Sequence, residues 1–300
     1  MHPLQVWKAL RFGEPADYLE PKTYKLPACN KVAEAFTANV MRSNGLLMIP
    51  GQAFSGGMIW QKCIFEAGEH FFNSDEPTDE HFKRKQGALS DHAASLRQKE
   101  IRQKTSEQSV TEFFNATYNI EVFAKDDPEV HRWLHELLKS AIIHAWTAYE
   151  VLAQDLWKGA VKKQPSLDNQ KGWTDKQRGN AKFQNRHGIA NFYRWTISYD
   201  NLDIISVVDN PAIHALAILR NALVHSAGKI DERFQKDREG IKVFGSSIKI
   251  PIPQLDQIRG KKEGYELKFN GTMVRSLVDP VVSLGFQLVK SVDEWLIKNP

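Results

Sequence analysis

The sequence is poor in the residues and segments that mark extracellular and membrane proteins. Its 300 residues include only two cysteines, Cys29 and Cys63. So few cysteines argue against a disulfide framework and against a cysteine-based zinc site. The N-terminus has neither the basic nor the apolar segment of a signal peptide, and no apolar run is long enough to span a bilayer. We therefore expect a soluble, cytoplasmic protein with no membrane partner.

The sequence also lacks the short motifs of several large enzyme classes. It has no glycine-rich phosphate loop ending in Lys-Ser/Thr and no Gly-x-Ser-x-Gly elbow. His131 and His135 have the spacing of a two-histidine metal clamp, but no glutamate lies between them and no cysteine pair completes a site. We therefore expect neither a metal nor another cofactor.

Charge of one sign is in only slight excess, with 40 Lys and Arg against 36 Asp and Glu. The net charge of +4 permits an anionic partner without demanding one, because strong nucleic-acid binders usually carry a denser basic stripe. Hydrophobic residues make up 42% of the chain and charged residues 25%, as in an ordinary globular protein. The length suits one large domain or two of average size.

The apolar pattern is mainly helical and predicts a boundary near residue 125. Residues 1–125 form a mostly helical N-terminal region of unknown role, in which Asn30 is placed to cap the first helix. Asp126-Asp127-Pro128 then marks a helix start. The following residues, 129–162, carry two apolar stripes, which predicts a long helix packed on two sides. We assign residues 126–300 to a helical domain.

The rest of this domain is predicted to be helical with one exception. Three further helices are expected over residues 181–199, 212–227 and 272–298. Alternating apolar residues over 248–252 and 265–269 predict two short strands that pair antiparallel. The fold class is therefore mainly α, with a short strand pair after the helix over 212–227.

The helix over 212–227 carries the most informative residues of the chain. Asn210-Pro211 gives its start, and Gly228 is placed to end it as the C′ residue. At about 100° per residue, most of its apolar side chains face one side. The opposite side is uncharged and consists of His214, Ile218, Asn221 and His225. A surface helix usually carries Lys and Glu there, so we interpret this face as a contact surface for a protein or a ligand.

Arg220 is not part of this face, because it lies roughly 140° from His225 around an ideal helix. Two interpretations of Arg220 remain open. In the first, it is buried and pairs with a carboxylate such as Glu150, which falls in an apolar stripe of the long helix and needs a partner. In the second, its guanidinium reaches a cleft and binds phosphate. His225 likewise either caps the helix end or moves a proton.

The segment Arg220–His225, Arg-Asn-Ala-Leu-Val-His, resembles the Arg-x(4–6)-His signature of HEPN domains. These are all-helical modules found in many RNA-cleaving toxins and antiviral effectors. The resemblance continues to Gly228 and Ile230-Asp231, includes the aromatic helix around residues 145–152, and covers about residues 129–298. It implies a HEPN-like helical bundle that forms a homodimer, with His214, Ile218, Asn221 and His225 as the dimer face.

The resemblance also implies a reaction, metal-independent cleavage of RNA in which the 2′-hydroxyl attacks the adjacent phosphate and leaves a cyclic phosphate. His225 is then the general base or acid, Arg220 stabilises charge on the phosphoryl oxygens, and Asn221 orients the histidine or the phosphate. Glu150 and His214 are possible supporting residues. A toxin–antitoxin or antiviral context implies an antitoxin or effector partner. The alternative is a non-catalytic HEPN-like module that dimerises or binds RNA or nucleotide.

Overall fold

The computed structural model describes residue 9 and the ranges 24–72, 94–95, 115–169, 189–197 and 201–299, with gaps at 117, 121, 123–124, 191, 194–195, 198–200, 240, 243–248, 251 and 259. Contacts divide the chain into two units, one formed by residues 1–7 and 48–132 and the other by residues 8–47 and 133–300. This division differs from the expected boundary near residue 125, because residues 8–47 belong with the C-terminal unit.

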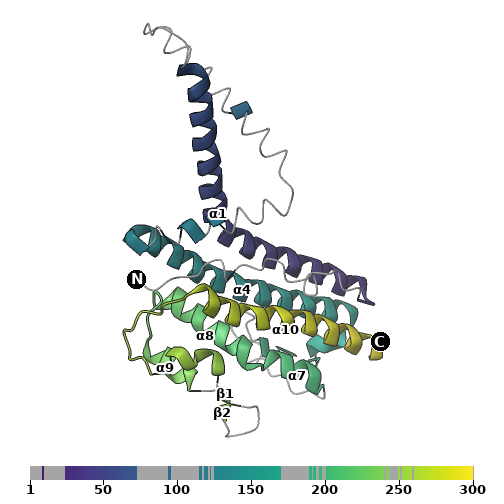
Figure 1. Cartoon of the computed structure of the whole chain (residues 1–300). Helices are drawn as coiled ribbons and strands as arrows, with labels where there is room; N and C mark the ends of the chain where they lie inside the picture. The colour runs from purple at the N-terminus through teal and green to yellow at the C-terminus, as the bar shows by residue number, and fades with distance from the viewer. Residues whose placement is uncertain are drawn as a thin grey trace. The chain divides into compact units, whose positions relative to one another are not determined.

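Two long helices contribute to both units. Helix α1 spans Pro27–Phe72 and helix α4 spans Pro128–Lys163 (Figure 1). The start of α4 confirms the predicted signal, because Asp127 Oδ1 accepts hydrogen bonds from the backbone N–H groups of Glu129 and Val130 at 2.8 and 3.2 Å. The polar stretch 74–108 lies outside the described residues, apart from 94–95. None of the described helices is long and apolar enough to cross a membrane.

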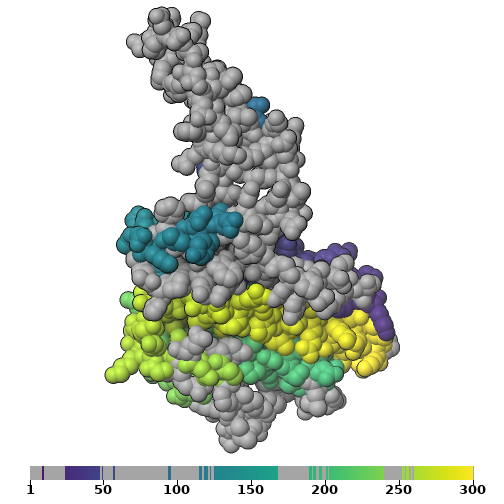
Figure 2. Space-filling view, in the orientation of Figure 1, coloured from purple at the N-terminus to yellow at the C-terminus, as the bar shows by residue number. Residues whose placement is uncertain are grey.

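The second unit is a layered arrangement of helices. After α4 come a short 3-10 helix, η3 (Pro165–Asn169), and helices α7 (Leu202–Val208), α8 (Pro211–His225), α9 (Glu232–Arg238) and α10 (Gly271–Lys298). Helix α10 packs on both α7 and α8. Its outer side forms a yellow strip along one face of the unit (Figure 2). The predicted helices over 129–162, 212–227 and 272–298 are thus confirmed, whereas most of 181–199 lies outside the described residues.

The core confirms that α4 is packed on two sides. Buried side chains occur in both predicted stripes, among them Leu134, Ala141, Ile142, Ala145, Trp146, Leu152, Ala153 and Leu156. A helix that buries residues around much of its circumference lies inside a bundle and not on its surface. Helix α4 is therefore an inner helix of this unit.

The first half of α1 joins this bundle through a close approach to α10. A Cβ atom on Gly285 would lie 2.6 Å from the ring of Phe36, so only glycine fits there. Two carboxylate oxygens of the buried Asp293 accept hydrogen bonds from the N–H groups of Lys25 and Leu26 at 3.0 and 2.8 Å. The expected cap at Asn30 is wrong, because α1 begins at Pro27 and the Asn30 side chain bonds the backbone of Tyr24.

The segment between α9 and α10 pairs differently from the expectation. Strand β1 (Ile241–Lys242) pairs antiparallel with β2 (Lys249–Ile250), and a 3-10 helix, η4 (Pro253–Ile258), follows. Residues 265–269, expected to pair with 248–252, instead make an antiparallel bridge between Glu266 and Lys229. The partner of each strand depends on which segment of the chain lies beside it in the folded unit. Alternation of apolar residues does not identify that partner.

Candidate functional site at the end of α8

Helix α8 has a buried first half and a partly exposed end. Asn210 caps it, accepting a hydrogen bond from the Ala212 N–H, as predicted. Every side chain from Ala212 to Leu219 is buried. Arg220 and Asn221 are half-buried, and Val224 and His225 are exposed. The polar chemistry that solvent or a ligand can reach is therefore confined to the last turns of the helix.

The expected four-residue contact face needs correction, because half of it is covered by the same chain. His214 and Ile218 are each only 2% exposed. Helices α9 and η4 pack on α8, and their side chains Phe234, Leu255 and Ile258 are buried. Apolar residues that follow the motif helix thus fold back and bury the part of α8 that a helical wheel leaves free. Only Asn221 and His225 of the predicted face remain accessible.

The helix ends in a tight turn that leads directly into α9. Ser226 is the C-cap, and Ala227 and Gly228 both have positive φ, 50° and 76°. The C′ residue is therefore Ala227, one position before the predicted Gly228. The Ser226 hydroxyl donates a short hydrogen bond to Asp231 Oδ2, while Asp231 Oδ1 accepts from the Phe234 N–H and caps α9. These hydrogen bonds lower the pKa of the Asp231 carboxyl, and the bond from Ser226 has the largest effect.

A small pocket lies between the last turns of α8 and the beginning of α9. Its volume is about 20 Å³, room for about one water molecule. It is lined by Ile218, Asn221, Ala222, His225, Asp231, Arg233, Phe234 and Asp237. The pocket therefore places an imidazole and a carboxamide beside two carboxylates, one of which lies 4.0 Å from the Arg233 guanidinium.

The α9 side of this pocket does not follow from the sequence pattern that predicts α8. Asp231 is part of the resemblance to HEPN domains, whereas Arg233 and Asp237 belong to no predicted motif. A capping signal was present, because an aspartate three residues after a helix-ending glycine is a good start for another helix. A second short helix directly after α8 would have placed residues 231–237 beside its end.

Arg220 does not line this pocket, but it contacts a residue that does. Its Nη1 donates a hydrogen bond to Asn221 Oδ1 at 3.1 Å. A guanidinium can only donate, so the oxygen of the Asn221 carboxamide must face Arg220 and the NH2 group must face elsewhere. Arg220 and His225 are thus connected through Asn221 and do not converge directly.

Glu150 on α4 is the electrostatic neighbour of Arg220. Burial raises the pKa of the Glu150 carboxyl, while the Arg220 guanidinium and a hydrogen bond from the Trp146 indole lower it in part. Glu150 Oε1 and Arg220 Nε are both buried, and neither atom has a hydrogen-bond partner. The first interpretation of Arg220 is therefore supported for its attraction to Glu150, without the contact pair that was expected.

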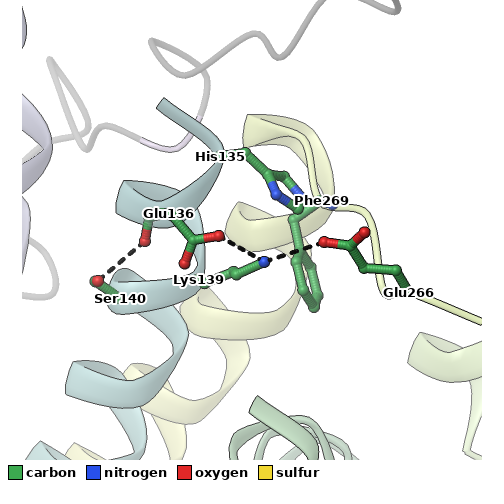
Figure 3. Close-up of polar contacts among 6 residues, drawn as sticks. All are labelled: His135, Glu136, Lys139, Ser140, Glu266 and Phe269. Atoms are coloured by element: carbon green, nitrogen blue, oxygen red, sulfur yellow. Dashed lines mark hydrogen bonds and ion pairs between the residues drawn. The ribbon is translucent and has the colours of Figure 1, made fainter. Parts of the chain in front are cut away.

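A buried lysine supports the turn that follows His225. Lys139 Nζ lies 2.7 Å from Glu136 Oε1 and 3.5 Å from Glu266 Oε1 (Figure 3). The backbone of Gly228 lies beside this lysine, since an added Cβ would be in ordinary contact with Nζ at 3.8 Å. The Leu267 N–H also donates to the Gly228 carbonyl at 2.8 Å. The segment 265–269 thus contacts the turn that follows α8.

His135 belongs to the same supporting cluster. Its Nε2 accepts a hydrogen bond from the Phe269 N–H at 3.0 Å; both residues are labelled in Figure 3. A ring nitrogen that accepts this bond has its lone pair engaged. Among the residues that the structure describes, no group of three or more His, Cys, Asp or Glu side chains can hold a metal ion.

Comparisons with models of protein families, with curated proteins and with solved structures find no match to this chain. A function can therefore be inferred only from the residues at the end of α8 and the chemistry that they can perform.

Proposed function

We propose that this chain is a HEPN-type endoribonuclease that works without a metal and acts at the end of α8. The observation that carries the proposal is the pocket in which the exposed His225 and the amide of Asn221 are the only described α8 side chains able to exchange protons or hydrogen bonds. An imidazole titrates near neutral pH and suits proton transfer to or from a ribose hydroxyl.

In the proposed reaction, the 2′-hydroxyl of one nucleotide attacks the phosphorus that follows it. His225 takes the hydroxyl proton, a new O–P bond forms, and the bond to the 5′-oxygen of the next nucleotide breaks. A second proton donor protonates that leaving oxygen, and the product ends in a cyclic phosphate. His225 of a second copy is a suitable donor, which is why we propose a homodimer.

Charge around the pocket restricts where the RNA phosphate can lie. On the α9 side, Asp231 and Asp237 outnumber the single cation Arg233, so the net negative charge repels a phosphate. The Asn221 NH2 group and the Arg220 guanidinium offer donors on the other side, and Arg220 stabilises the charge on the phosphoryl oxygens once it reaches them. We therefore place the phosphate against Asn221, between His225 and Arg220.

The proposed dimer surface is smaller than the one inferred from the helical wheel. With His214 and Ile218 buried, the part of α8 available for this contact consists of the exposed Val224 and His225 and the half-buried Asn221. Val224 is 46% exposed, and an exposed apolar side chain next to the pocket suits contact with a second copy. A monomer at micromolar concentration in light scattering would contradict this part of the proposal.

One observation favours a second candidate, a non-catalytic HEPN-like module that binds RNA or nucleotide. Arg220 lies outside the pocket, and its guanidinium donates to Asn221. Catalysis requires this guanidinium to reach a phosphate bound at the pocket, whereas a binding module does not.

Incubation of the purified protein with single-stranded RNA in excess EDTA separates the two candidates. The enzyme proposal predicts cleavage and fragments that end in a 2′,3′-cyclic phosphate. Binding of the same RNA without cleavage supports the binding module, and a requirement for added metal contradicts the proposed mechanism. A toxin–antitoxin or antiviral role predicts in addition that expression of the active protein arrests growth of its host cell.

A further inference from the structure

His135 is a buried histidine that accepts a backbone hydrogen bond from a segment far away in the sequence. The side chain is 8% exposed, and its Nε2 accepts from the Phe269 N–H at 3.0 Å. The rings of His135 and Phe269 also stack, with centroids 6.1 Å apart. An imidazole nitrogen accepts a hydrogen bond only when it carries no proton. The contact between α4 and Phe269 therefore requires a neutral His135.

The segment that His135 contacts also holds the turn after α8. Three backbone hydrogen bonds of 2.8–2.9 Å connect residues 264–269 with residues 228–230. They join Leu267 to Gly228, Ile230 to Tyr265, and Gly264 to Ile230. Gly228 follows His225 by three residues. A change at Phe269 can therefore reach the end of α8 through a short, hydrogen-bonded path.

The charges near His135 do not prevent it from taking up a proton. Figure 3 shows Glu136 and Lys139 on α4 and Glu266 on the facing segment. Lys139 Nζ lies 2.7 and 3.5 Å from the two carboxylates, so this group carries one positive and two negative charges. Of the titratable neighbours in sequence, His131 has a buried Nε2 without a hydrogen-bond partner, and Lys268 is exposed. Protonation is opposed mainly by burial of the ring and by loss of the bond from Phe269.

The choice of histidine at this position needs an explanation beyond stability. An amide oxygen would accept the same N–H at every pH, whereas an imidazole loses this capacity when it is protonated near neutral pH.

We propose that His135 is an acid-sensitive switch, in which protonation of Nε2 breaks the bond from Phe269 and releases segment 264–269 from the turn after α8. The closed arrangement has no proton on Nε2 and the released arrangement can bind one, so a falling pH favours release. The closed arrangement is fully stabilised above the ordinary imidazole pKa of about 6.5, and it loses up to about tenfold in its equilibrium for each pH unit below that value. Only the consequence for RNA cleavage, a disturbed His225 in acid, rests on the proposed function.

Hydrogen–deuterium exchange of the full chain tests this switch. Segment 264–269 contains three of the donors, and mass spectrometry gives its protection relative to an unstructured chain at the same pH. Between pH 7.5 and pH 5.5 we expect this protection to fall roughly fivefold to tenfold in the wild type. The buried part of α8, residues 213–219, should change by less than about twofold, because a local opening leaves it folded.

Two variants assign the effect to His135. His135→Gln places an amide oxygen near the position of Nε2 and cannot titrate, so the protection of segment 264–269 should change by less than about twofold over the same pH range. His144→Gln makes the same change at an exposed position of α4 and should keep the pH dependence of the wild type. Should His135→Gln not fold, NMR of the histidine rings in the wild type replaces it, and His135 should then become protonated in step with the loss of protection.

Several results would overturn the switch. They are a wild-type protection of segment 264–269 that does not depend on pH, the same pH dependence in His135→Gln, an equal loss in residues 213–219, and a His135 ring that is already protonated at pH 7.5.

The exchange experiment contains no RNA, so its outcome is separate from that of the proposed function. Cleavage of RNA together with pH-independent protection supports the nuclease and contradicts the switch. Protection that falls in acid and depends on His135, together with absence of cleavage, supports the switch in a protein that is not a nuclease.

Discussion

In burial and polarity, the first and second halves of α8 differ more than the two sides of the helix do. From Ala212 to Leu219 the helix is buried all round, including its one polar side chain, His214. From Arg220 to His225 it carries a guanidinium, a carboxamide and an imidazole, with only Ala222 fully buried. Polarity therefore changes along the axis of the helix. The first half contributes stability, and the last turns are where chemistry can occur.

The difference arises because other elements cover the two halves unequally. Helix α10 and the residues after α8, including α9 and η4, pack on α8. Beyond Leu219 the cover is incomplete, because Val224 and His225 are exposed, and the chain turns at Ala227 and Gly228 before entering α9. Substitutions in the two halves should consequently have different kinds of effect, the first half on stability and the last turns on activity.

The largest expected effect tests the last turns. His225→Ala should lower the rate of RNA cleavage by about 10²- to 10⁴-fold, the usual contribution of a general acid or base. Because His225 is exposed, the free energy of unfolding should change by less than about 0.5 kcal/mol. Single-turnover cleavage and urea denaturation measure the two quantities. His144→Ala, which removes an exposed histidine from α4, is the matched control. Full activity of His225→Ala would contradict the assignment of catalysis to the last turns of α8.

The next effect tests the first half of the helix. Leu216 is fully buried, so Leu216→Ala should lower the free energy of unfolding by about 2–5 kcal/mol through lost burial and a new cavity. Leu223→Ala makes the same change at a half-buried position of the last turns, and the loss should be clearly smaller. Urea denaturation compares the two leucines directly. Equal losses would show that the halves do not differ in packing.

The helices themselves were predictable because their signals are local. Asp127 and Asn210 cap α4 and α8 through side-chain oxygens that bond the first free N–H groups, and these bonds need no distant partner. The start of α1 was missed because the groups that fix it are far apart in sequence. Its entry is held by Asp293, more than 260 residues away along the chain.

The candidate site was predictable only in part, for a related reason. A helical wheel correctly separates Arg220 from His225, since their directions depend on helix geometry alone. It does not reveal that His214 and Ile218 are buried, nor that α9 and its cap add Asp237 and Asp231 to the pocket. Which residues of a helix stay accessible depends on tertiary packing, and here the packing was set by segments after the motif.

A smaller effect tests the reassignment of His214. This side chain is 2% exposed and lies 3.9 Å from Asp209, so His214→Ala should lower the free energy of unfolding by about 1–3 kcal/mol. The rate of cleavage per folded molecule should stay within about twofold of the wild type. Thermal denaturation and light scattering follow stability and oligomeric state. Loss of a dimer with stability unchanged would return His214 to the contact face and weaken the division of α8 into two halves.

The smallest effect concerns the connection between the last turn of α8 and α9. The lowered pKa of Asp231 means that its charged form is favoured by folding, mainly through the Ser226 hydroxyl. This stabilisation is present above the pKa of the unfolded chain, near 3.8, and is lost as the pH falls through the lower pKa of the folded state. Asp231→Ala removes both the charge and the cap and should cost about 1 kcal/mol at pH 7. Asp231→Asn keeps a capping oxygen and should cost less.

The pH dependence separates the charge from the cap. The difference in stability between the wild type and Asp231→Asn should shrink as the pH is lowered below 3.8, because the wild-type carboxyl then also becomes neutral. Denaturation curves for both proteins between pH 7 and pH 3 measure this difference. A difference that does not change with pH would mean that the Ser226 contact does not depend on the charge. The turn after His225 would then be stabilised by the Asp231 cap and the Lys139 cluster. The charge of Asp231 would contribute little to the stability of the end of α8.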